Sequence, residues 1–123
     1  MKLHGIVNCD TVKKARAWLD ARGVAYEWVD FHKAPPSLED LARWCRLVGW
    51  ETLLNRRGTT WRALDDAAQA AVVDERTAVA LMQANPTLIK RPVVEVDGDV
   101  VVGFSEAGYG ARFAKKWGQT RLS

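Results

Sequence analysis

The fold is decided by residues 3–31, which read LHGIVNCDTVKKARAWLDARGVAYEWVDF. Residues 3–7 and 26–31 are rich in apolar and aromatic side chains and predict two strands. The segment between them predicts a helix to about Arg22, with apolar positions at i, i+3 and i+7: Val12, Ala15 and Leu19. A strand, a helix and a strand within about thirty residues form a βαβ unit, so the two strands are expected to be parallel.

A helical region is expected in the middle of the chain. Pro35-Pro36 precedes an amphipathic helix that Ser37 caps and that ends at Gly49. Its predicted apolar face comprises Leu38, Leu41, Ala42, Cys45 and Val48. A short helix over 50–54, a loop over 55–62 and helices over 65–73 and 74–84 follow, and Asn85-Pro86 ends the last of them.

The C-terminal part predicts two strands and a helix. Valine-rich strands over 92–96 and 99–102 flank Asp97-Gly98, a strong hairpin signal, so this pair is expected to be antiparallel. Ser105 caps a last helix, whose apolar side comprises Tyr109, Phe113 and Trp117. The order predicts an α/β protein with a thioredoxin-like fold: a mixed four-stranded sheet with a helical insertion, at about 37–85, between its βαβ and ββα halves.

Length and composition set the class of protein. The 123 residues predict one domain over 1–117, followed by a short tail at 118–123. Hydrophobic residues make up 48% and charged residues 27%, as in a soluble globular protein. The net charge of +3 is spread along the chain, which argues against a nucleic-acid partner. No apolar run approaches the ~20 residues of a membrane span, and no leader is evident, so we expect no membrane partner and a cytoplasmic location.

Cys9 is the candidate catalytic residue, because it stands directly between an apolar strand and a helix. A helix N-terminus offers unpaired N–H groups and partial positive charge, both of which favour the reactive thiolate. Lys13 and Arg16 add positive potential, whereas Asp10 opposes a second negative charge unless it is occupied as the helix cap. The alternative interpretation is a buried structural cysteine.

The residue that resolves Cys9 is left open by the sequence. Val12 occupies the fourth position of what would be a Cys-x-x-Cys motif, so Cys9 lacks a local resolving thiol. Cys45, an external thiol such as glutathione, or a partner protein could take that role, although the position of Cys45 on an apolar helix face predicts core packing. The cysteines and histidines lack metal-site spacing, and no glycine-rich phosphate loop occurs, so no bound metal or cofactor is expected.

Four segments of the chain resemble the arsenate reductase-related (ArsC/Spx) family, and most of all its YffB-like branch. They are residues 5–15 (GIVNCDTVKKA), 49–62 (GWETLLNRRGTTWR), 89–92 (IKRP) and 103–106 (GFSE). The resemblance extends over nearly the whole chain. It implies a thioredoxin-like fold with a catalytic cysteine in the first loop, and that cysteine corresponds to Cys9.

The resemblance also implies an anion-binding arginine next to the catalytic thiolate. In arsenate reductases one such arginine precedes a proline, and Arg91-Pro92 matches this pair. Thioredoxin-like folds have a cis-proline at the start of the third strand, so the Arg91–Pro92 bond is expected to be cis. The turn is then expected to aim Arg91 toward Cys9.

Two further arginines of arsenate reductases have no clean match in this chain. Ungapped comparison puts Asn55 at one position, with Arg56 and Arg57 just beyond it, and Gly103 at the other. The candidate anion- or glutathione-binding residues are therefore Arg91, Lys13, Arg57, Arg56, Pro92, Asn8 and Trp61. For Lys13, Arg56 and Arg57 the alternative is a solvated surface position.

The leading functional prediction is a small thiol oxidoreductase with one nucleophilic cysteine and glutathione as co-substrate, not a bound cofactor. Another small thiol, an oxyanion or a protein thiol is a further candidate substrate. The second interpretation is a non-enzymatic module like the Spx branch, which contacts RNA polymerase; Val12 removes the Cys-x-x-Cys switch of its redox-sensing members. Arsenate reduction is third, because of Asn55 and Gly103.

Overall fold

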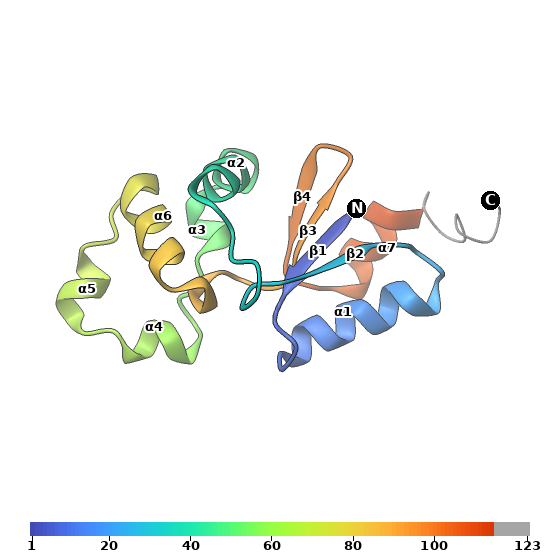
Figure 1. The fold of residues 1–123 in the computed structure, drawn as a ribbon, viewed down its shortest axis with the longest axis horizontal. Coiled ribbons are helices and arrows are strands. Elements are labelled where there is room, and N and C mark those ends of the chain that lie inside the picture. Colours follow the sequence, from blue (N-terminus) through green and yellow to red (C-terminus); the bar gives the residue numbers. More distant parts are fainter. Residues whose placement is uncertain (115–123) are drawn as a thin grey trace. The chain divides into compact units, whose positions relative to one another are not determined.

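Four strands form one mixed sheet in the computed structural model, which describes residues 1–114 (Figure 1). The strands are β1 (Lys2–Gly5), β2 (Glu27–Asp30), β3 (Val93–Val96) and β4 (Asp99–Val102). Their order in the sheet is β2-β1-β3-β4, with β1 parallel to β2 and antiparallel to β3, and β3 antiparallel to β4. The mixed four-stranded sheet and the direction of each predicted strand pair are confirmed.

The chain divides into two compact units. The sheet unit combines Met1–Asp30 with the residues from Arg91 onward, and the helical unit is Phe31–Lys90. The helical unit thus corresponds to the predicted insertion between the βαβ and ββα halves, with slightly wider bounds.

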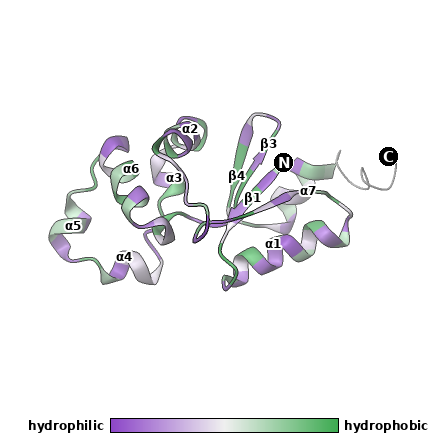
Figure 2. Cartoon of the chain, viewed as in Figure 1, coloured by the Kyte–Doolittle hydropathy of each residue, from purple (hydrophilic) through white to green (hydrophobic). Residues whose placement is uncertain are grey.

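Two helices of the sheet unit, α1 (Asp10–Ala21) and α7 (Glu106–Phe113), pack on one face of the sheet around a single core. The buried members of that core come from both helices, three strand positions and the loop between α1 and β2: Leu3, Val12, Ala15, Trp18, Leu19, Val24, Val94, Val96, Tyr109 and Phe113. Hydrophilic and hydrophobic residues alternate around α1, as its predicted amphipathic pattern requires (Figure 2). The Tyr109 ring makes edge-to-face contacts with Phe113 on its own helix and with Trp18 on α1, and the Trp18 contact joins the two helices.

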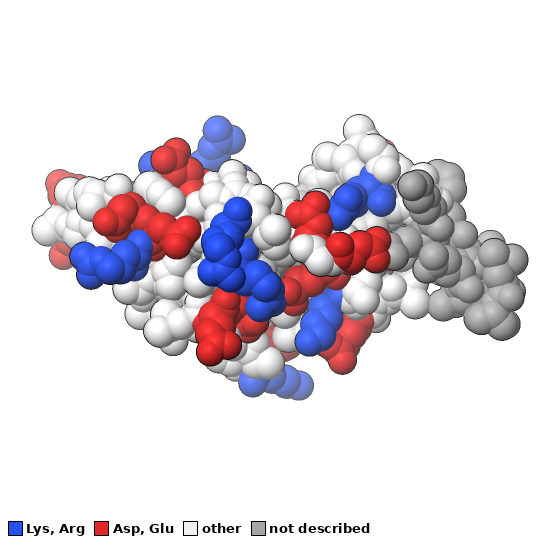
Figure 3. Space-filling model, turned by 90° about the horizontal axis from the view of Figure 1, so that it is seen from above, with Lys and Arg blue, Asp and Glu red and all other residues white. Residues whose placement is uncertain are grey.

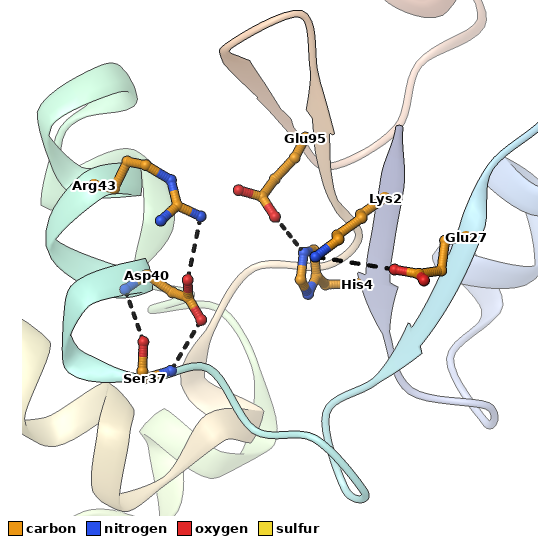
Figure 4. A network of polar contacts seen from close by, with 7 residues as sticks. All are labelled: Lys2, His4, Glu27, Ser37, Asp40, Arg43 and Glu95. Carbon is orange, nitrogen blue, oxygen red and sulfur yellow. Dashed lines mark hydrogen bonds and ion pairs between the residues drawn. The ribbon is translucent and has the colours of Figure 1, made fainter.

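The opposite face of the sheet carries polar side chains on β1 and β3 (Figure 4). His4 Nε2 and Glu95 Oε2 lie 2.8 Å apart, and the His4 side chain is largely buried. Lys2 and Glu27 form a longer contact of 4.0 Å between side chains that are more than half exposed. Such an exposed pair contributes little to stability.

The helical unit consists of five helices and a 3₁₀ turn. They are α2 (Leu38–Val48), α3 (Trp50–Leu53), α4 (Thr59–Ala63), α5 (Asp66–Ala70), α6 (Glu75–Ala84) and the turn η1 (Pro86–Leu88). Ser37 caps α2 as predicted: its hydroxyl accepts from the Asp40 N–H while the Asp40 carboxylate accepts from the Ser37 N–H (Figure 4). Helix α2 packs against α3 and α6, and its Trp44 and Cys45 are buried.

Three expectations for the helical region were wrong. The predicted loop over 55–62 contains α4, and the predicted helix over 65–73 is only the five-residue α5. Helix α4 spans little more than one turn, too short for a hydrophobic period, and contacts outside it hold it: Thr60 donates to Thr87, and Gln69 donates to the Trp61 carbonyl. Leu38, expected on the apolar face of α2, is 50% exposed because it occupies the first turn.

The hairpin and the last helix agree with the sequence. Asp97 and Gly98 form the β3–β4 turn with φ values of +53° and +76°, as a two-residue hairpin turn requires. Ser105 caps α7 by accepting from the Gly108 N–H at 3.0 Å. Trp117, predicted on that helix, and the predicted tail at 118–123 lie outside the described residues.

Charged side chains of both signs are interspersed on the molecular face seen in Figure 3, without a continuous field of either sign. Within residues 1–114, none of the helices has the length and apolar character needed to cross a membrane.

Candidate active site

Cys9 occupies the N-cap position of α1. Its backbone is extended (φ −117°, ψ 120°), and its carbonyl oxygen accepts from the Lys13 N–H at 2.9 Å. The half-buried side chain makes no capping hydrogen bond, so the sulfur lies at the helix terminus without being engaged by it. Asp10, considered as the cap, is instead the first helical residue. The N-cap position thus places Cys9 next to the unpaired first-turn N–H groups and the positive end of the α1 dipole.

Gly5 fixes how closely α1 approaches the strand that leads to Cys9. A Cβ atom at position 5 would lie 2.8 Å from Val12 Cγ2 and 3.4 Å from Trp28 Cη2. Val12 is itself buried, in the first turn of α1, so only a hydrogen at position 5 leaves room for this packing. The sequence showed Gly5 as part of a motif but gave no reason for it.

Substitution of Gly5 by alanine is expected to destabilise the protein by about 1–3 kcal/mol, because the added methyl group forces α1 away from β1. Thermal unfolding measures this effect. Gly110→Ala is the matched control: the position lies within α7 with no atom near the new Cβ, so alanine there is expected to be neutral or stabilising. An unchanged melting temperature for Gly5→Ala would contradict the close packing.

Three segments meet at the end of the sheet from which the Cys9 loop leaves. Because β1 and β3 are antiparallel, the last residue of β1 and the start of β3 lie at the same end, and the Val93–Val102 pair adds the last residue of β4. Arg91 and Pro92 directly precede β3, and Gly103 directly follows β4. We call this region, with Cys9, Arg91, Pro92 and Gly103, the Cys9 end of the sheet.

The Arg91–Pro92 peptide bond is cis, as predicted. Pro92 is buried, and its carbonyl oxygen accepts from the Gly103 N–H at 2.8 Å. The Arg91 side chain is half-buried, and its Nε atom is shielded from solvent. A guanidinium group in such a position retains its charge, because arginine does not deprotonate in proteins.

The two departures from the arginine pattern of arsenate reductases both have local structural roles. Gly103 has a φ of +81°, a backbone conformation that glycine adopts freely and arginine does not, and its carbonyl oxygen accepts from the Tyr109 hydroxyl. Asn55 closes a turn by accepting from the Arg57 N–H at 3.1 Å. Gly103 thus allows the backbone its positive φ, and the Asn55 side chain stabilises a backbone turn.

The remaining candidates of the sheet unit, Asn8 and Lys13, are exposed on either side of Cys9. Sequence reasoning missed a third basic residue as a binding candidate: the Arg16 guanidinium carbon lies 4.3 Å from the centre of the Trp28 ring, and Arg16 Nε donates to the Tyr26 hydroxyl at 3.2 Å. The available signal was spacing, since Arg16 lies seven residues after Cys9 and three after Lys13 on one helix face.

Three candidates belong to the helical unit. Arg56 is exposed and lies against other surface groups of its own unit, 3.9 Å from Glu51 Oε2 and 5.4 Å from the Trp50 ring centre. Arg57 is exposed and contributes its backbone N–H to the Asn55 turn. Trp61 is half-buried on α4. The contacts given for Arg56 and Arg57 match the surface alternative, so their anion-binding role stays a prediction.

Cys45 has the surroundings of a structural cysteine. It is 3% exposed on α2, and burial together with the nearby Glu75 carboxylate raises the pKa of its thiol to about 11. The thiol therefore remains protonated at neutral pH and is a poor nucleophile. In the described part of the chain, no group of three or more His, Cys, Asp or Glu side chains is arranged to hold a metal ion.

Comparison with known proteins agrees with this geometry. The ArsC family model matches residues 4–112, which include the whole Cys9 end of the sheet. The chain belongs to the ArsC family. It is similar to a solved YffB protein, with 50% identity and a TM-score of 0.85 over 89% of this chain and 96% of that one.

Two further similarities are to an arsenate reductase-related protein and to a transcriptional regulator. An arsenate reductase (ArsC) related protein from Brucella melitensis is 46% identical, with a TM-score of 0.73 over 91% of this chain and 92% of that one. The global transcriptional regulator Spx of Streptococcus agalactiae is 30% identical over 104 residues, which are 80% of this chain and 72% of that protein. Both an enzyme-related branch and a regulator are therefore among its relatives.

Proposed function

We propose that this ArsC-family protein is a thiol oxidoreductase that reduces glutathione mixed disulfides through Cys9. The observation that carries the proposal is the position of Cys9: its sulfur lies at the N-terminus of α1, unused by the cap. The Arg91–Pro92 turn begins its strand at the same end of the sheet. The N-terminus of a helix and a partly buried guanidinium group both favour negative charge on a nearby sulfur or carboxylate.

The proposed reaction is two successive thiol–disulfide exchanges. The Cys9 thiolate attacks the glutathione sulfur of a mixed disulfide R–S–S–G, forming Cys9–S–S–G and releasing R–S⁻, which takes a proton from water. A second glutathione thiolate attacks the glutathione sulfur bound to Cys9, and oxidised glutathione leaves with regeneration of the Cys9 thiolate. The balance is R–S–S–G plus GSH giving R–SH plus GSSG, so the two electrons come from glutathione.

The surroundings of the two alternative thiol positions support resolution of Cys9 by an external thiol. Val12, which stands where a local resolving cysteine would be, is 1% exposed in the core. Cys45 is buried with a raised pKa, to about 11. Glutathione supplies the missing thiol, and its two carboxylates suit the basic residues Lys13 and Arg91. Asn8 and Pro92 belong to the same proposed site. The helical unit adds three further candidates: Arg56, Arg57 and Trp61. We place this chemistry in the cytoplasm, where glutathione keeps such cysteines reduced.

A second candidate, a regulator that contacts RNA polymerase, is favoured only by the similarity to Spx proteins. Such a function does not need the thiol, so polymerase binding should be unaffected by Cys9→Ser. Arsenate reduction is the third candidate, and the backbone roles of Gly103 and Asn55 leave Arg91 as the one clean match to the arsenate-binding arginines.

The test is incubation of the protein with oxidised glutathione, followed by intact-mass measurement and peptide mapping. We expect one glutathione per chain, on the Cys9 peptide, and its release on addition of reduced glutathione. Cys45→Ala should give the same adduct. An adduct on Cys45, or no adduct on the folded protein, contradicts the proposal.

A further inference from the structure

Arg16 is a basic residue of the sheet unit that the proposed reaction does not yet use. Two contacts hold its guanidinium group in place: Trp28 lies beneath it, 4.3 Å from ring centre to guanidinium carbon, and the Tyr26 hydroxyl accepts from Nε at 3.2 Å. Both contacts come from the segment around β2, while Arg16 itself lies on α1. Because the side chain is held in one orientation, a ligand that binds it loses less conformational entropy than with a mobile arginine.

Most of the N–H donors of the Arg16 guanidinium group are not used by these two contacts. Within residues 1–114, Arg16 forms no ion pair with a carboxylate, and Nε supplies only one of its five N–H donors. Tyr26 is a neutral partner, since burial raises the pKa of its hydroxyl. The Asp20 carboxylate, one helical turn further along α1, also contacts the Tyr26 hydroxyl, by a hydrogen bond and electrostatically, so Tyr26 is a shared partner of Arg16 and Asp20. Tyr26 takes up the Nε donor of Arg16, and the Nη donors keep the bidentate geometry that suits a carboxylate.

The spacing connects Arg16 to Cys9. Seven residues separate them on α1, which is nearly two full turns and about 10 Å along the axis, so both lie on one face with Lys13 between them. The Trp28 ring under Arg16 also reaches the Cys9 strand, since its Cη2 would contact a Cβ at Gly5. The cysteine of glutathione is its middle residue, so a terminal carboxylate extends only roughly 7 Å from the sulfur bound to Cys9. The long Arg16 side chain has to cover the rest of the separation.

We infer that Arg16 binds a terminal carboxylate of the peptide thiol held on Cys9 and so selects anionic peptide thiols over neutral ones. The inference rests on the proposed function, because it assigns one part of the substrate of that reaction. Trp28 and Tyr26 are positioning residues that act through Arg16. The class of ligand is a short peptide thiol with a free carboxylate, of which glutathione, with two, is the example.

Binding of an unreactive ligand tests Arg16 separately from catalysis. Titration calorimetry with S-methylglutathione should show binding to the wild-type protein that Arg16→Ala weakens about tenfold and Arg16→Lys restores only in part. The second part of the test removes one carboxylate from the ligand. The glycyl ethyl ester of S-methylglutathione lacks the free glycine carboxylate, and S-methyl-cysteinylglycine lacks the γ-glutamyl carboxylate. The wild type should lose affinity for one of them, and Arg16→Ala should bind that analogue as well as it binds S-methylglutathione.

Arg22 provides the matched control. It is the C-cap residue of α1 and, like Arg16, is stacked on a tryptophan, with its guanidinium carbon 4.0 Å from the Trp18 ring centre, but it lies at the end of the helix remote from Cys9. Arg22→Ala should leave the affinity for S-methylglutathione unchanged. Equal affinity of Arg16→Ala and wild type, or no binding to the wild type, overturns the inference. Glutathionylation of Cys9 reports separately on the proposed function, which stands if the adduct forms while Arg16→Ala binds normally.

Discussion

Replacement of Cys9 by serine is expected to reduce turnover of a glutathione mixed disulfide by roughly 10³-fold or more, to the uncatalysed rate. The serine hydroxyl does not ionise at neutral pH, so the helix N-terminus has no anion to stabilise and no covalent intermediate forms. Release of free thiol from a glutathionylated peptide, with reduced glutathione in excess, measures the turnover. The substitution is nearly isosteric at a half-buried position, so the fold should be retained.

Cys45→Ala is the control for this experiment and should turn over substrate as the wild type does. Its thiol is buried on α2 with a pKa raised to about 11, so it neither attacks substrate nor resolves Cys9 at neutral pH. If Cys45→Ala abolishes turnover while the protein stays folded, Cys45 is the resolving thiol and the external-glutathione step is wrong.

Arg91→Ala is expected to lower kcat/KM for the same substrate by about 10- to 100-fold, mainly by raising KM. A charge-assisted hydrogen bond from a guanidinium group to a carboxylate or to a developing thiolate is lost, while the backbone of the Arg91–Pro92 turn is unchanged. Arg91→Lys should recover only part of the loss, since lysine lacks the planar fork. Initial rates at varied substrate concentration separate KM from kcat.

The neighbouring Lys90 offers a control, because it is exposed and adds the same kind of charge one residue away. Lys90→Ala should leave KM unchanged. If Arg91→Ala instead lowers the melting temperature and leaves KM as it was, Arg91 has a packing role and the anion site is not there.

Much of the fold could be predicted because its signals act over a few residues. The helical period of α1, the Ser37 and Ser105 caps and the Asp97-Gly98 turn each specify local backbone geometry, and all four are present in the structure. The position of Cys9 at a helix N-terminus could also be predicted from local signals, because an apolar strand precedes it and a helical period follows it. Helix α4 was missed because its five residues are too few to show a period, and bonds such as Thr60–Thr87 join residues distant in sequence.

The sequence by itself therefore determined the order of the strands and of the longer helices, the position of Cys9 at a helix N-terminus and the proline that carries the cis bond. Only the tertiary structure decided why position 5 must be glycine, why position 103 cannot readily be arginine, and that Arg16 is held on Trp28. These features depend on contacts between elements or on the dihedral angle at one residue. Neither leaves a periodic trace in the sequence, because the partners of each residue become neighbours only after the strands and helices have packed.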